Sequence, residues 1–292
     1  MPRISVVIPN LNSPMIDQTL ASLRKQAFDL SQVEVLVVGL DGPGLVQEDT
    51  LVRLISTGTP ASPSVARNIG IRRAAGDLIC FTDADCIAEP DWLAQLVAAF
   101  TDEAINVVGG GVTFVSDNYW TLCDNLSWFH EYLTTTSPGT RGLLPTLNLC
   151  VRRKVIEAVG GLNEDYPKAA GEDAEWTTRM RQAGFELRFL PQAVIHHHPS
   201  RASRADIWRH AHTYGRYSVK VNAAFADFLD APFVFRSPWA LALALPVLAL
   251  GGTARIFARN LAVWPYMHTA PGILLSKIAW LMGALQTLRR AM

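Results

Sequence analysis

The first third of the chain alternates short apolar runs with segments of helical spacing, and this alternation restricts the possible folds more than any other feature. Three runs are short and rich in β-branched residues, as strands buried on both faces are: Ile4–Ile8, Val33–Val38 and Leu78–Thr82. Between them, Met15–Ala27 and Ser64–Ala75 place apolar residues at helical spacing. This order favours an α/β fold with a doubly wound, mostly parallel sheet flanked by helices. Such sheets bind ligands at the carboxyl ends of their strands.

The same alternation continues to about residue 200. We expect a helix at Trp92–Phe100, a strand at Val107–Val115, an extended segment at Leu144–Arg152, a helix that stops at Gly160-Gly161 and a helix at Glu172–Ala183. These elements belong to one α/β domain, which we place at residues 1–200.

Net charge and cysteine content limit the environment and the partners of the chain. Its 292 residues carry a formal net charge of zero, so we do not expect nucleic acid as a partner. Four cysteines without C-x-x-C spacing fit a reducing compartment better than a disulfide framework or a zinc site. The N-terminus is typical of a first strand and not of a signal peptide. We therefore expect the working part to face the cytoplasm.

The chain becomes more apolar beyond residue 200. On a helical wheel, the apolar residues of segment 201–230, such as Ile207 and Ala211, lie opposite basic residues such as Arg216. This pattern is typical of a basic amphipathic helix on an anionic membrane, although a helix that packs on the catalytic domain with a solvated basic face has the same pattern. Residues 231–292 form two hydrophobic segments, one borderline and one interrupted for a membrane span. We expect shallow or re-entrant membrane association, at the cytoplasmic face of the cell membrane, because a hairpin places its central arginines outside.

Two acidic residues, Asp83 and Asp85, directly follow the third apolar run. If the backbone is extended there, residues i and i+2 share a face, and both carboxylates can reach one cation. Carboxylate oxygens suit Mg²⁺ or Mn²⁺, which leave coordination positions to substrate phosphates. The alternative is a polar loop after a strand. The pair is therefore a candidate metal site for a bound diphosphate.

Other polar residues offer the remaining parts of such a site. Asp41 lies in the Gly-rich turn after the second run and can accept a hydrogen bond from a nucleobase, or it can simply shape the turn. Arg67 can stabilise a phosphate and Asn68 can cap or orient, unless both lie on an exposed helix face.

Acidic residues and histidines near the end of the predicted domain are further candidates. Glu172 and Asp173 begin a helix, where they either complement the helix dipole or supply a base for an acceptor hydroxyl. Three histidines, 196–198, follow a strand-like run, and alternation separates His197 from the other two. One of them, with His197 as the candidate, can complete the coordination of the metal or contact the diphosphate. The alternative is a polar cluster at a strand end.

Taken in order, these residues resemble the family-2 glycosyltransferases, which have the GT-A fold. The likeness covers about residues 3–200 and lies in the segments SVVIPNLNSPMIDQTLASL, SVARNIGIRRAAGDLICFTDADC, TLNLCVRRKVIEAVGGLNEDY and GEDAEWTTRMRQAG. By this resemblance, Asp83 and Asp85 bind the ribose and diphosphate of the donor through a divalent metal, with Asp85 as the more direct ligand. Asp173 is the implied base, supported by Glu172.

The resemblance also implies further donor-binding residues and an activity. Pro9 and Asn12 match the donor-binding end of the first strand, and Asn148 is expected to shape the sugar pocket. The implied reaction is a single, inverting transfer from a UDP-, GDP- or dTDP-linked sugar to a hydroxyl of a glycan or lipid-linked acceptor of the cell envelope, with Mg²⁺ or Mn²⁺.

Two departures from the family pattern qualify this expectation. The chain reads VVGLDGPG where the family has a paired acidic D-D-G-S motif, and it lacks the Q-x-x-R-W signature of processive synthases. The second departure favours a single addition over polymerisation. Two alternatives stay open: a nucleotidyltransferase, which the glycine-free segment 9–12 disfavours, and a membrane-associated binding protein that keeps the fold without catalysis.

Overall fold

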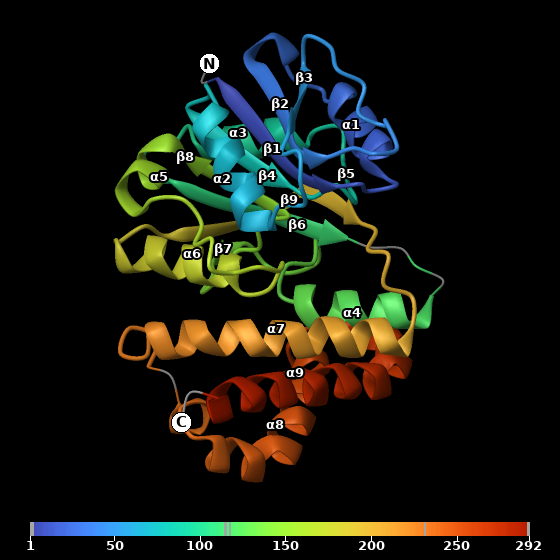
Figure 1. Cartoon of the computed structure of the whole chain (residues 1–292), viewed down its shortest axis with the longest axis vertical. Coiled ribbons are helices and arrows are strands. Elements are labelled where there is room, and N and C mark those ends of the chain that lie inside the picture. The colour runs from blue at the N-terminus through green and yellow to red at the C-terminus, as the bar shows by residue number, and fades with distance from the viewer. Residues whose placement is uncertain (1–2, 114–115, 117, 231, 291–292) are drawn as a thin grey trace. The chain divides into compact units, whose positions relative to one another are not determined.

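The computed structural model describes residues 3–113, 116, 118–230 and 232–290. The chain divides into two compact units: residues 1–113 with 137–198, and residues 114–136 with 199–292 (Figure 1). The expected boundary at residue 200 is therefore close to the last change of unit. The structure differs from the expectation by assigning residues 114–136 to the C-terminal unit.

The first unit is built on a nine-stranded sheet. Its strands are β1 (Ile4–Leu11), β2 (Val33–Leu40), β3 (Val52–Ser56), β4 (Leu78–Thr82), β5 (Cys86–Ala88), β6 (Val107–Thr113), β7 (Gly139–Thr140), β8 (Asn148–Arg152) and β9 (Leu187–His197). They lie in the order β3-β2-β1-β4-β8-β6-β9-β5, with β7 beside β9 (Figure 1). The part β3-β2-β1-β4 is parallel, β8 is antiparallel to β4 and β6, and β6 and β9 are again parallel.

The parallel part brings three polar strand ends to one edge of the sheet. Ile4 of β1 pairs with Val33 of β2 and with Leu78 of β4, so these strands start level and run in one direction. Their carboxyl ends lead directly into Asn12, Asp41 and Asp83. The edge expected from strand alternation is therefore present.

Helices flank this sheet. They are α1 (Ile16–Arg24), η1 (Leu30–Gln32), α2 (Pro63–Arg73), α3 (Trp92–Ala99), α5 (Arg153–Val159) and α6 (Glu172–Gln182). The start of α2 is fixed by Ser62, whose side chain accepts a hydrogen bond from the Val65 N–H, and by Pro63 in the first turn. The large side chains of Phe81, Trp92 and Trp176 are fully buried in the core of this unit.

One local expectation differs from the structure, and a second falls partly outside the described residues. The segment Asp83–Asp85 is not extended, because residues 84 and 85 form a turn in which the Cys86 N–H donates to the Asp83 carbonyl over 3.1 Å. The strand expected at 107–115 is present up to Thr113, and residues 114–115 lie outside the described part of the chain. The sequence reading also missed the short strands β3 and β5.

The second unit is helical. It contains α4 (Tyr119–Phe129), α7 (Arg204–Ala224), η2 (Phe233–Phe235), α8 (Pro238–Arg259), η3 (Leu261–Thr269) and α9 (Ala270–Arg290). Within this unit α9 lies between α7 and α8 (Figure 1). Helix α4 contributes Leu122, Cys123 and Leu126 to a buried cluster with residues of α7, α8 and α9.

Helix α7 packs on protein rather than presenting an apolar face. Ile207 and Ala211, expected on its lipid-facing side, are fully buried within the second unit. The helices α7 and α9 approach closely at Gly215, where an added Cβ would lie 1.9 Å from the Trp280 carbonyl oxygen. These contacts of α7 are with other helices of the second unit, which neither the membrane interpretation nor its alternative predicted. Among the residues described, one helix, α8, is long and apolar enough to cross a membrane.

Candidate active site

The loops after β1 and β2 hold each other at the carboxyl edge of the sheet. Asn12 has a positive φ of 57°, and its Oδ1 accepts a hydrogen bond of 2.7 Å from the Gly42 N–H. The two carboxylate oxygens of Asp41 accept hydrogen bonds from the N–H groups of Leu45 and Val46, at 3.1 and 2.7 Å. Asp41 therefore shapes its own turn, which is one of the two roles expected for it. Its contact with a nucleobase stays a prediction.

Close packing of β1 on β2 precedes these loops. Pro9 is half-buried inside β1, opposite Val38 of β2. At Gly39, with a φ of +139°, an added Cβ would lie 1.9 Å from the Asn10 carbonyl oxygen. Only glycine fits there, because any side chain would collide with the neighbouring backbone. Gly39, the first glycine of the VVGLDGPG segment, is thus needed to hold Asn12 and Asp41 next to each other.

A buried arginine joins the acidic motif after β4 to the acidic motif of α6. The guanidinium of Arg67, on α2, contacts Asp83 Oδ1 through Nη2 at 2.7 Å and Glu172 Oε1 through Nη1 at 3.3 Å. The side chains of Arg67 and Glu172 are only 3% and 4% exposed, and that of Asp83 is 31% exposed. Arg67 was expected to contact phosphate. The structure instead occupies two of its nitrogens with carboxylates, and the phosphate contact stays a prediction.

The α6 carboxyls titrate abnormally because they are buried next to each other. Burial and then the charge of Asp173 raise the pKa of Glu172 to about 7, against the opposing effect of the Arg67 guanidinium. Burial also raises the pKa of Asp173, although its Oδ1 accepts a hydrogen bond of 2.8 Å from the Ala174 N–H. Helix α6 begins after Gly171, which has a φ of 88°. Glu172 is therefore poised to exchange a proton near neutral pH, next to a second carboxyl whose pKa is also raised.

Two buried polar atoms of this cluster have no partner among the described residues, namely Glu172 Oε2 and Arg67 Nε. Buried polar atoms normally find partners in protein or water. Their presence in one cluster is typical of a site that a ligand or water completes.

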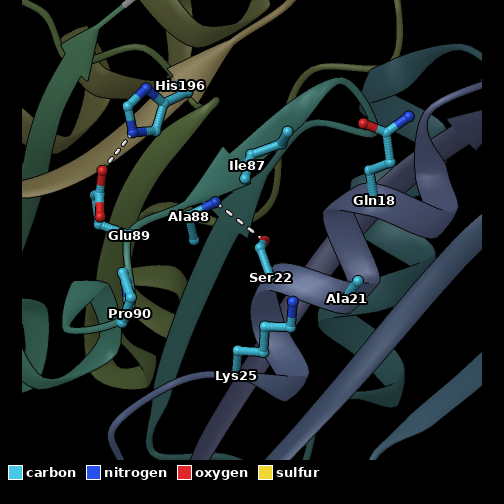
Figure 2. Close-up of a pocket in the computed structure, with 9 residues that line it drawn as sticks. All are labelled: Gln18, Ala21, Ser22, Lys25, Ile87, Ala88, Glu89, Pro90 and His196. Atoms are coloured by element: carbon cyan, nitrogen blue, oxygen red, sulfur yellow. Dashed lines mark hydrogen bonds and ion pairs between the residues drawn. The ribbon is translucent and has the colours of Figure 1, made fainter.

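Asp85 lies at the other side of the turn, next to β9. The strand pair β5–β9 places Cys86 opposite His197, and the His198 N–H donates to the Asp85 carbonyl over 2.9 Å. This pairing sets His197 Nε2 at 3.8 Å from Asp85 Oδ2. Alternation sends His196 to the opposite face, where it contacts Glu89 beside a groove lined by α1 (Figure 2). The expected separation of His197 from His196 is therefore present.

The donor atoms fit a metal that a substrate shares. In the described ranges, no group of three or more His, Cys, Asp or Glu side chains is arranged to hold an ion by itself. Asp85 and His197 nevertheless offer an oxygen and a nitrogen close together, and Asp83 follows two residues before Asp85. Mg²⁺ and Mn²⁺ sites that use one or two carboxylates and complete their shell with phosphate oxygens need no more than this.

Asn68 holds the loop that precedes α6. Its Nδ2 donates to the Leu162 carbonyl and to Glu164 Oε1, each at 2.8 Å, and its Oδ1 accepts from the Leu162 N–H at 2.8 Å. The residue therefore orients protein backbone, which is one of the two roles expected for it. A direct contact with the donor stays a prediction.

Asn148 joins three elements at the start of β8. Its Nδ2 donates to the carbonyls of Gly111 and Ala193, at 2.9 and 2.8 Å, and its Oδ1 accepts from Trp92 Nε1 at 2.9 Å. The side chain is fully buried. Its geometry supports the fold beneath the expected sugar pocket, while contact with a sugar stays a prediction.

The structure thus brings Arg67, Asp83, Glu172 and Asp173 into one cluster. Sequence reasoning missed Ser13, whose hydroxyl donates to the Ala84 carbonyl over 2.8 Å and so connects the loop after β1 to the turn between the two aspartates. A polar residue directly after Asn12 was the only sequence signal for it.

Comparison with solved structures identifies the fold. The chain is similar to the mannosyltransferase PcManGT from Pyrobaculum calidifontis, solved with GDP-Man and Mn²⁺, with a TM-score of 0.65 and 21% identity over 99% of this chain and 87% of that chain. It is also similar to GalNAc-T7, solved with UDP, GalNAc and Mn²⁺, with a TM-score of 0.57 and 17% identity over 76% of this chain and 48% of that chain. The α/β sheet with its acidic strand ends is the GT-A fold of glycosyltransferases.

The sequence comparisons identify the family. The model of glycosyl transferase family 2 matches residues 5–159, and the chain belongs to this family. Glycosyltransferase AglE of Haloferax volcanii is 32% identical over 211 residues, which cover 69% of this chain and 68% of that protein. The probable glycosyltransferase YdaM of Bacillus subtilis is 29% identical, and the match spans 66% of this chain and 50% of that protein. The predicted family, fold class and enzyme class, a glycosyltransferase, are confirmed.

Proposed function

We propose that this glycosyltransferase moves one sugar, with inversion, from a UDP-, GDP- or dTDP-linked donor to a hydroxyl of a glycan or lipid-linked acceptor of the cell envelope, at the cytoplasmic face of the membrane. One observation carries the proposal. Arg67 contacts both Asp83, next to the expected diphosphate site, and Glu172, next to the expected base. Donor-side and acceptor-side motifs that are distant in sequence therefore meet at one side chain.

Asp173 is the proposed base. As the acceptor oxygen attacks the anomeric carbon, its proton passes to the Asp173 carboxylate, and the bond from that carbon to the nucleoside diphosphate breaks. A single displacement of this kind inverts the anomeric centre. The half-buried position of Asp173 raises its pKa, which makes this carboxylate a stronger base than an exposed aspartate. Glu172 and Arg67 position it from within the buried cluster.

The leaving group needs positive charge. Asp85, with Asp83 and His197, would hold Mg²⁺ or Mn²⁺, and a bound divalent ion would stabilise the negative charge of the departing diphosphate. The PcManGT and GalNAc-T7 structures were solved with GDP-Man or UDP and with Mn²⁺, which supports this donor class. The nucleotidyltransferase and non-catalytic alternatives lack comparable support from the family.

A panel of nucleotide sugars tests the proposed reaction. The purified enzyme is incubated with UDP-, GDP- and dTDP-linked sugars, and the release of nucleoside diphosphate is measured with Mn²⁺, with Mg²⁺ and with EDTA. We expect one donor to be hydrolysed faster than the others, with the rate abolished by EDTA and restored by added metal. Release of pyrophosphate from nucleoside triphosphates would favour nucleotidyl transfer instead. Equal rates of nucleoside diphosphate release with metal and with EDTA would contradict the proposed metal dependence.

The raised pKa of Glu172 predicts the pH profile of the enzyme. Until the Glu172–Asp173 pair has lost its last proton, near pH 7, part of the population keeps that proton on the base. We expect kcat/KM to rise with pH and to level off near pH 7. In Glu172→Gln the acid limb should move to lower pH, because the carboxyl whose pKa is about 7 is then gone. If the acid limb of kcat/KM lies at the same pH in the wild type and in Glu172→Gln, the Glu172–Asp173 pair does not cause it.

A further inference from the structure

Helix α8 exposes a continuous row of large apolar side chains. Trp239, Leu243, Val247 and Leu250, which we call the apolar stripe, follow one another at intervals of four, four and three residues and so lie on one helix face. Leu243 is 86% exposed and Val247 is 73% exposed. The following helix, η3, exposes Leu261, Trp264 and Met267 as well. Exposed apolar surface on this scale is typical of a binding surface.

The opposite face of α8 is packed within the second unit. Leu241 and Ala249 of α8 are buried with Leu281 and Ala284 of α9 in one hydrophobic cluster. Helix α8 therefore has one face that packs on protein and one that does not. A helix that packs on protein along one side in this way leaves its other side for the interface plane of a membrane.

Charge selects an anionic partner for the exposed face. From residue 231 to the C-terminus the sequence has no Asp or Glu, while it has five arginines and one lysine. Arg236 precedes α8, and Arg255 and Arg259 lie in its last two turns, all three exposed. An apolar row with arginines at both ends complements a leaflet whose acyl chains lie beneath anionic headgroups.

Length alone does not decide between spanning and lying in the plane. The 22 residues of α8 extend about 33 Å, close to the thickness of a bilayer core. Its partner α9, however, holds the half-buried Lys277, whose Nζ donates to the Ser127 carbonyl of α4 over 2.9 Å. Helix α4 also holds the buried Asp124 in contact with Arg201 and His210. Insertion of α8 across the bilayer would either break its packing on α9 or draw these charges towards hydrocarbon, which is costly.

We propose that α8 lies in the plane of an anionic membrane, with the apolar stripe in the boundary between headgroups and acyl chains and with Arg236, Arg255 and Arg259 among the headgroups. This inference rests on the membrane location in the proposed function and specifies it. It assigns the expected membrane contact of residues 231–292 to α8 and leaves α7, whose Ile207 is buried, out of that contact.

Vesicle flotation tests the surface. The full-length protein is mixed with preformed vesicles of phosphatidylcholine alone or of phosphatidylcholine with phosphatidylglycerol. We expect it to float with the anionic vesicles, and Leu243→Glu/Val247→Glu to partition at least about tenfold less, because charged side chains enter the boundary unfavourably. Ala223→Glu, at an exposed position of α7, is the matched control and should float like the wild type. Equal flotation of the stripe variant, or wild-type self-association through the stripe without flotation, would overturn the proposal.

Labelling from outside distinguishes the plane from a span. Ser237→Cys and Arg259→Cys place a thiol at either end of α8, and the four native cysteines are buried. With an impermeant maleimide, both ends should react on vesicle-bound protein; protection of one end would indicate a span.

Donor hydrolysis by the same proteins without lipid separates the two proposals. Flotation without hydrolysis would leave the surface valid and reject the proposed reaction, and hydrolysis without flotation would do the reverse.

Discussion

Asp173→Asn is expected to lower kcat by about 10²- to 10⁴-fold, the usual contribution of a positioned general base. Asparagine keeps the size of aspartate and can still accept a hydrogen bond from the Ala174 N–H, which is 2.8 Å away in the native protein. It cannot take a proton from the acceptor. Since the lost interaction belongs to the transition state, kcat/KM should fall with kcat while the binding of the nucleoside diphosphate stays unchanged.

Asp102→Asn is the matched control for this experiment. Asp102 is exposed and precedes β6, which runs parallel to β4 through β8, so it lies at the amino edge of the sheet. The control should keep wild-type transfer rates. Comparable transfer by Asp173→Asn and the control, with both folded, would remove Asp173 from its proposed role and leave Glu172 as the candidate base.

Arg67→Met is expected to lower the free energy of unfolding by about 3–5 kcal/mol at pH 8, as the loss of one partner does in a buried ion pair. Two carboxylates lose their shared cation, and Glu172, at 4% side-chain exposure, has little access to water. Transfer activity should fall as well, because the donor-side and acceptor-side motifs lose the contact that joins them. Urea unfolding and transfer rates measure the two effects.

The pH dependence gives the sign of this effect. Arg67 lowers the pKa of Glu172, so its removal raises that pKa further above about 7. A carboxyl whose pKa is raised by folding stabilises the native state while it is protonated, at low pH. This stabilisation is lost as the pH rises through the pKa of the folded protein. The cost of Arg67→Met should therefore be smaller at pH 5 than at pH 8.

A second substitution tests whether Glu172 is responsible. Arg67→Met/Glu172→Gln should recover part of the lost stability at pH 8, because the buried charge is gone. Glu157→Gln, on the exposed side of α5, should recover none of it. Additive losses in the double variant would show that the contact between Arg67 and Glu172 contributes no coupling free energy.

Much of the catalytic domain was predictable because its signals are local. The limits of β4 were predicted as observed, since a five-residue apolar run followed by Asp83 needs no distant information. The family followed from short segments in a fixed order. The turn at Asp83–Asp85 was predicted wrongly, because it is stabilised by the β5–β9 pairing, and β5 has only three residues.

The sequence by itself determined the α/β class, the family and the acidic residues that follow the strands, because hydrophobic period and strand ends are properties of neighbouring residues. Only the tertiary structure decided which partners those residues take. Arg67 and Glu172 are 105 residues apart, and no local pattern encodes their contact. In the same way, the period of α7 predicts an apolar face but not what covers it, and burial of Ile207 within the second unit left the exposed stripe to α8. The hydrophobic periodicity of a helix specifies its apolar face, and tertiary packing decides whether protein or membrane covers that face.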